Sequence, residues 1–152
     1  MSNLKERINA DLKSAMIARD ELTTQTLQGL KSAILYEEVA KKVRETGLDE
    51  AAIEQVIVRE VKKRDEAAEL FDKGGNAGSA EKERTEKKVL AVYLPEQMSE
   101  EELSAVVAAT ISELKPDSPK DMGRVIGAVK AKVGNAGDGS LIAKLVKDSL
   151  QS

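Results

Sequence analysis

The sequence predicts an all-α protein built from two helical modules. Charged residues make up 34% of its 152 residues, and Ala, Glu, Lys and Leu are abundant, a composition typical of helical proteins. Apolar residues recur at helical spacing, and no run alternates with a period of two over the length of a strand. The aromatic residues are only three, so the core must be built from Leu, Ile, Val, Ala and Met.

Two helices are expected to form a hairpin at the start of the chain. Apolar residues spaced four apart predict a first amphipathic helix, which Ser2 or Asn3 opens and which ends near Arg19. Asp20 is a suitable N-cap for a second, longer helix. We expect this helix to end at about Thr46, because a glycine follows.

Two further helices complete the first module. Asp49 is expected to cap the third helix, and Ser79 is expected to start the fourth, which runs to Val92. Three glycines and an asparagine within residues 74–78 favour a turn between the two helices. The predicted buried face of the third helix consists of Ile53, Val56, Ile57, Val61, Ala67, Ala68 and Phe71.

A break near residue 95 divides the chain. Pro95 lacks an N–H and disfavours helical geometry in the residue before it. Ser99 and Glu102 then have the spacing of a capping box, which starts a new helix. The boundaries predicted from these signals are 1–94 for an N-terminal long-helix bundle and 95–152 for a compact C-terminal module. We expect Tyr93 to pack between the two.

The second module is predicted to contain three short helices. The first stops before Pro116, and the next begins with Ser118 as N-cap and Pro119 at the first helical position. A second glycine-rich segment, residues 134–139, precedes a last helix that Ser140 is expected to cap.

The composition excludes several kinds of chemistry. The sequence has no cysteine or histidine, which removes thiolate nucleophiles, imidazole bases and the usual zinc sites. Carboxylate pairs such as Glu83 and Glu86 are more simply interpreted as solvated helix faces. We therefore predict no catalytic residue, no metal and no cofactor.

The N-terminus lacks a signal-peptide pattern, and no apolar run approaches the roughly 18 residues of a membrane span. We expect a cytoplasmic protein without membrane contact.

Charge is distributed unevenly over the second module. Residues 120–147 contain six basic and two acidic residues, whereas residues 95–114 contain five glutamates and no basic residue. A basic surface of this kind binds phosphate backbones, although an ordinary solvated surface is an equally good interpretation. The glycines of 134–139 allow either a tight turn or backbone N–H contacts to a phosphate. The candidate RNA-binding residues are Arg124, Lys130, Lys132, Gly137, Gly139, Lys144 and Lys147.

Several short motifs, in this order, resemble those of the GatB/YqeY family. They cover nearly the whole chain and comprise residues 63–64, 71, 74–75, 83, 86, 93–99, 121–125 and 138–139. The resemblance implies a two-part helical fold similar to the C-terminal tail of the B subunit of the tRNA-dependent amidotransferase. In that enzyme the tail looks like a tRNA-gripping appendage, while the chemistry occurs on other domains.

Three functions are compatible with these observations. The leading hypothesis is a non-catalytic accessory module that binds tRNA. The resemblance also allows a part in glutamine-dependent amide transfer to misacylated tRNA, a carbon–nitrogen ligase activity. The third hypothesis is an adaptor that docks on an aminoacyl-tRNA synthetase or an amidotransferase.

Overall fold

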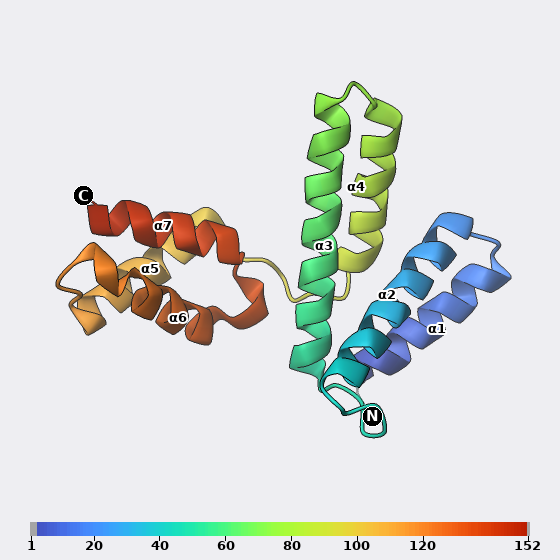
Figure 1. The fold of residues 1–152 in the computed structure, drawn as a ribbon, viewed down its shortest axis with the longest axis horizontal. Helices are drawn as coiled ribbons and strands as arrows, with labels where there is room; N and C mark the ends of the chain where they lie inside the picture. The colour runs from blue at the N-terminus through green and yellow to red at the C-terminus, as the bar shows by residue number, and fades with distance from the viewer. Residues whose placement is uncertain (1–2, 152) are drawn as a thin grey trace. The chain divides into compact units, whose positions relative to one another are not determined.

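The computed structural model describes residues 3–151 and confirms the all-α prediction (Figure 1). These residues form two compact units, the first ending at Leu94 and the second beginning at Pro95. The elements are α1 (Asn3–Ile17), α2 (Glu21–Ala40), α3 (Glu50–Lys73), α4 (Ala77–Ala91), α5 (Glu100–Leu114), the short 3-10 helix η1 (Pro119–Asp121), α6 (Met122–Val133), the 3-10 helix η2 (Gly134–Ala136) and α7 (Gly139–Gln151).

The first unit consists of two helical hairpins, α1–α2 and α3–α4 (Figure 1). Helix α2 contacts both α3 and α4, so the hairpins enclose a common core. This core is aliphatic apart from one tyrosine and consists of Leu4, Ile8, Leu12, Leu27, Leu30, Ile34, Leu48, Ile53, Val56, Ile57, Leu90 and Tyr93.

The far half of α3 is less buried than the sequence pattern predicts. Ile53, Val56 and Ile57 are buried, and Ala68 is the one buried residue of the second half. Phe71, expected to be buried, is 37% exposed, because only α4 packs along this end of α3. The apolar pattern alone does not reveal how far the covering helices extend.

Three of the predicted N-caps are confirmed. Asp20 accepts a hydrogen bond from the Thr23 N–H, and Asp49 accepts one from the Ala52 N–H. At the start of α5, the Ser99 hydroxyl accepts from the Glu102 N–H, and the Glu102 carboxylate accepts from the Ser99 N–H. The capping box therefore has both of its hydrogen bonds.

The prediction that the second helix continues to Thr46 is wrong. Helix α2 ends at Ala40, and Lys42 has a left-handed backbone with φ 59°. The cause is Glu38, which is only 2% exposed and accepts a hydrogen bond from the Leu48 N–H at 3.1 Å. Because this bond requires the chain to turn back, Leu48 enters the core and the helix cannot continue.

Two helices begin earlier than predicted. Asn76, not Ser79, caps α4, since the Asn76 side chain accepts from the Ser79 N–H at 3.0 Å. Likewise the Asp138 carboxylate accepts from the Ser140 N–H at 3.2 Å, which places Ser140 inside the first turn of α7. In both cases an upstream side chain supplies the oxygen that the serine was expected to supply.

The start of α6 also differs from the prediction. Pro119 opens the 3-10 helix η1, and α6 itself begins at Met122. The Ser118 hydroxyl accepts a hydrogen bond from the Lys120 N–H at 3.3 Å, so Ser118 caps η1 rather than α6. Its carbonyl oxygen accepts from the Asp121 N–H, while the Asp121 carboxylate accepts from the Asp117 N–H. These local bonds stabilise a tighter turn before the α-helix.

The second unit is a three-helix bundle in which α5, α6 and α7 contact one another. Its buried core is entirely aliphatic and consists of Leu103, Val107, Val125, Val129, Ile142 and Val146. Across residues 3–151, no helix combines the length and apolarity required to cross a membrane.

Candidate nucleic-acid interface

The helices of the second unit direct several predicted RNA-binding residues outward. Val125 and Val129 bury one face of α6, which leaves Lys130 exposed. Ile142 and Val146 do the same for α7, so Lys144 and Lys147 lie on its exposed surface. Lys144 and Lys147 are three residues apart and therefore neighbours on one face.

Arg124 is held within the unit. Its Nη2 donates to the Leu114 carbonyl oxygen at 3.5 Å and lies 3.6 Å from the Asp121 carboxylate. A cation at this position also complements the negative end of α5, where helix carbonyls lack partners. Arg124 thus contributes to helix packing, and Asp121 offsets part of its charge.

Lys132 joins α6 to α5. Its Nζ donates to the Thr110 hydroxyl at 3.0 Å and to the Glu113 carboxylate at 2.9 Å. Thr110 is fully buried, so the lysine stem lies against the bundle while its amine is neutralised at the surface. The sequence pattern of α6 does not predict this link between the two helices, because both partners of Lys132 lie on α5.

Lys130, Lys144 and Lys147 differ from these two residues. All three are exposed, and within residues 3–151 no hydrogen bond or ion pair occupies their amines. The Lys130 Nζ lies 3.6 Å from the position that a Cβ on Gly139 would take, at the start of α7. We call Lys130, Lys144 and Lys147 the unpaired lysine set.

Close packing explains why one residue of the glycine-rich segment 134–139 is glycine. A Cβ on Gly137 would lie 2.5 Å from a methyl of Val133, 3.0 Å from Ile142 and 3.2 Å from Leu103. The Gly137 N–H donates to the Gly134 carbonyl at 3.4 Å. Gly137 therefore allows η2 to approach the core closely, which favours the tight-turn interpretation at this residue.

The segment that follows Pro95 holds η2 in place. The Met98 N–H donates to the Ala136 carbonyl at 2.8 Å, and the Gln97 side-chain amide donates to the Asn135 carbonyl at 3.0 Å. Sequence reasoning identified Gln97 only as part of a motif. Its structural role depends on a residue 38 positions away.

Helix α5 begins with an acidic first turn. The Ser99 backbone N–H, and then the Ser99 side chain, hold the pKa of Glu102 below its ordinary value. Glu100 and Glu101 lie in the same first turn. The unit therefore carries acidic groups at the start of α5 and unpaired cations on α6 and α7. Among the described residues there is no cluster of three or more acidic side chains that could hold a metal ion.

These features define an all-helical protein with an electrostatically divided second unit. Comparison with known proteins assigns the class: the family described as Yqey-like protein matches residues 5–150. The chain belongs to this family.

Two curated proteins are similar to most of this chain. The chain is 33% identical over 121 residues to "Altered inheritance of mitochondria protein 41, mitochondrial" from Lachancea thermotolerans, covering 78% of this chain and 62% of that protein. The protein of the same name from Kluyveromyces lactis is 32% identical over 129 residues, covering 82% of this chain and 68% of that protein. The match thus leaves about a third of each relative outside it.

Proposed function

We propose that this protein is a non-catalytic accessory module that binds tRNA through its second unit. The observation that carries the proposal is the unpaired lysine set, Lys130, Lys144 and Lys147, whose amines have no acceptor within residues 3–151. Cations that are not neutralised within a protein can replace the counterions of a phosphate backbone.

The expected recognition is of backbone and shape. The three aromatic residues of the chain are Tyr36, Phe71 and Tyr93, and all precede the second unit. Without aromatic side chains, this unit lacks the main platforms on which unpaired bases stack. Folded RNA, in which phosphates lie at fixed spacing, is therefore a better ligand class than single strands. Arg124 and Lys132 would add to the positive electrostatic potential that attracts phosphates, while they keep their hydrogen-bond and ion-pair partners within the bundle.

Filter binding of total tRNA to the full chain across a salt series tests the proposal. Replacing the unpaired lysine set by alanine should weaken binding and lower the salt slope by about one unit for each phosphate that the variant no longer neutralises. A matched control is the triple change of Lys13, Lys62 and Lys82 to alanine, which removes the same charge from exposed positions of the first unit. Equal reductions in the two triple variants, or no tRNA binding at low salt, would refute the proposal.

A second candidate function is an adaptor for an aminoacyl-tRNA synthetase or an amidotransferase. The observation that favours it lies on α2, where Tyr36 is 77% exposed and Val39 is 55% exposed, three residues apart on one face. Exposed apolar groups of this kind occur at protein interfaces. Co-purification of such an enzyme after nuclease treatment, lost on Tyr36→Ser, would support the adaptor over the tRNA-binding module.

The proposal places the protein in the cytoplasm. The names of the two fungal relatives assign those proteins to mitochondria. Cell fractionation distinguishes a cytoplasmic from an organellar location of this protein. Recovery in an organelle fraction would overturn the cytoplasmic assignment.

A further inference from the structure

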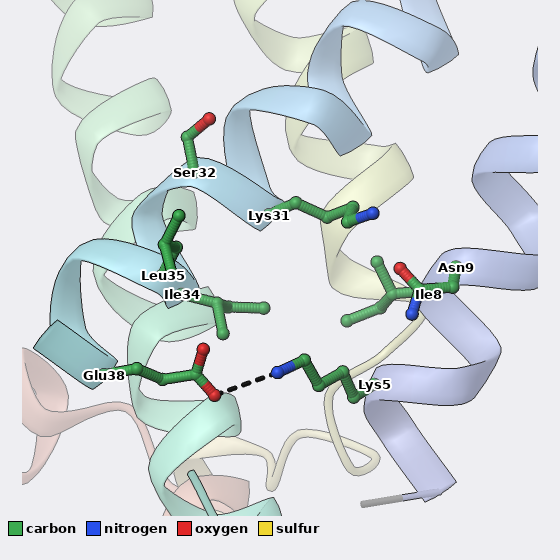
Figure 2. A pocket seen from close by; sticks show the side chains of 8 residues that line it. All are labelled: Lys5, Ile8, Asn9, Lys31, Ser32, Ile34, Leu35 and Glu38. Atoms are coloured by element: carbon green, nitrogen blue, oxygen red, sulfur yellow. Dashed lines mark hydrogen bonds and ion pairs between the residues drawn. The ribbon is translucent and has the colours of Figure 1, made fainter. Parts of the chain in front are cut away.

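A cavity in the first unit has features of a small-molecule site. It lies between α1 and α2 and has a volume of about 260 Å³ (Figure 2). Ile8, Ile34 and Leu35 provide its apolar lining. This volume is close to the lower end of ligand pockets, which range over roughly 300–1,000 Å³. The cavity is therefore large enough for a small molecule, whereas drug-sized ligands would exceed it.

One end of the cavity carries a buried carboxylate with an unused oxygen. The Oε2 of Glu38 accepts from the Lys5 Nζ at 3.0 Å and from the Leu48 N–H at 3.1 Å. Within residues 3–151, no hydrogen bond is donated to the other oxygen, and Figure 2 shows it directed toward Ile34, away from Lys5. Glu38 is only 2% exposed, so this oxygen has little contact with solvent, and a ligand donor placed here would form a charge-assisted hydrogen bond with it.

The opposite end of the cavity carries a cation. Lys31 precedes Glu38 by two helical turns, a separation of about 10 Å along α2. Figure 2 shows the Lys31 side chain extending toward α1, and Asn9 of α1 also lines the cavity. Lys31 is exposed, and in the described part of the chain its amine has no ion-pair partner. An acidic group of a ligand would find both the ammonium of Lys31 and the amide of Asn9 here.

We propose that this cavity binds a small acid that carries a hydrogen-bond donor at its other end. The donor, an ammonium or hydroxyl group, would occupy the free oxygen of Glu38. The acid would pair with Lys31, and an apolar middle section would lie on Ile8, Ile34 and Leu35.

Simpler ligands fit the cavity less well. A purely apolar molecule would leave both polar ends without partners. An acid without a donor would pair with Lys31 but make no hydrogen bond to the free Glu38 oxygen. The salt bridge between Lys5 and the Oε2 of Glu38 fixes the carboxylate before any ligand binds, so the position of its free oxygen is preorganised.

The test uses ε-aminocaproate as the probe, since it has an amine and a carboxylate at the two ends of an apolar chain. Caproate and hexylamine each lack one end. Titration of the isotope-labelled full chain should shift the backbone amide signals of α1 and α2 around Asn9 and Lys31. Caproate and hexylamine should each bind at least about tenfold more weakly than ε-aminocaproate, because each lacks one charge-assisted hydrogen bond.

Lys31→Met is the decisive variant, because it keeps the length of the side chain and removes its charge at an exposed position. We expect it to reduce ε-aminocaproate affinity about tenfold and to leave hexylamine affinity unchanged. Lys13→Met is the matched control, an exposed lysine of α1 outside the cavity lining. The proposal is overturned if no amide around the cavity shifts, if the three probes bind equally, or if both variants behave alike.

Discussion

Charged side chains have different roles in the two units. In the first unit they join helices: Lys87 pairs with Asp65 at 2.8 Å, Arg59 with Glu37 at 3.2 Å, and Arg84 with Asp72. In the second unit Lys132 makes such a link, but Lys130, Lys144 and Lys147 have no partner within residues 3–151. Both units are rich in lysine, so the number of basic residues alone does not identify a binding surface. Exposed lysines without a partner within residues 3–151 also occur in the first unit, for example Lys13 and Lys62, so what distinguishes residues 120–147 is the balance of six basic against two acidic residues.

The two units differ in aromatic content, so the unfolding of the first unit can be followed separately from that of the second. Every aromatic residue of the chain lies in the first unit, and the second unit has an aliphatic core. Tyrosine fluorescence and near-ultraviolet circular dichroism therefore report on the first unit alone. Far-ultraviolet circular dichroism reports on the helices of both.

The largest expected effects come from truncating one core at a time. Ile57 and Ile142 are fully buried in the first and second unit, respectively. Each change to alanine should cost about 2–5 kcal/mol, because a cavity remains in a packed core. If the units fold independently, Ile57→Ala should lower the tyrosine-detected transition and Ile142→Ala should leave it unchanged. A shift of the tyrosine transition by Ile142→Ala would show that the units unfold together.

A smaller effect is expected from Gly137→Ala. The added methyl group would overlap Val133 and crowd Ile142, so the second unit should lose about 1–3 kcal/mol of stability. Gly127→Ala is the control within α6, since a Cβ there meets nothing within 4 Å. This control should gain about 0.5–1 kcal/mol from the better helix propensity of alanine. Thermal unfolding by far-ultraviolet circular dichroism compares the two, and equal stabilities would contradict the packing role of Gly137.

The smallest effect concerns Tyr93. Its hydroxyl donates to the Asp11 carboxylate at 2.6 Å, and Arg7 lies over its ring at 4.9 Å. Tyr93→Phe should cost the first unit about 1 kcal/mol at neutral pH through loss of this bond. Chemical denaturation followed by near-ultraviolet circular dichroism measures the cost, and unchanged stability would show that the bond contributes nothing.

The same tyrosine predicts a dependence on alkaline pH. Burial, and then the hydrogen bond to Asp11, raise the pKa of Tyr93 well above its ordinary value. The unfolded chain therefore ionises first, so this stabilisation is complete below pH about 10 and is lost as the pH rises further. In a Tyr36→Phe variant the remaining tyrosine absorbance should titrate above its ordinary range. Titration at the ordinary value would show that Tyr93 is open to solvent.

The sequence allowed prediction of features that depend on neighbouring residues. The caps at Asp20, Asp49 and Ser99 were predictable because each side chain binds an N–H three residues further on. The break before Pro95 follows from the geometry of proline itself. The helical fold class likewise follows from local periodicity.

Features that depend on distant residues were missed. The end of α2 follows from the burial of Glu38, whose partner Lys5 lies 33 residues earlier. Tyr93 belongs to the core of the first unit and donates to Asp11, 82 residues away, a contact that the sequence did not predict. The ties of Lys132 to α5 could not be read from its own helix either.

We propose that Lys130, Lys144 and Lys147, in the basic segment 120–147 of the second unit, bind RNA, and that the charged residues of the first unit do not. Cross-linking of RNA to the full chain in cells, with the attached RNA sequenced and the attachment residues mapped, tests it most directly. We expect tRNA as the attached RNA and attachment on α6 and α7, near Lys130, Lys144 and Lys147. Attachment confined to α3 and α4, or no recovered tRNA, would contradict it.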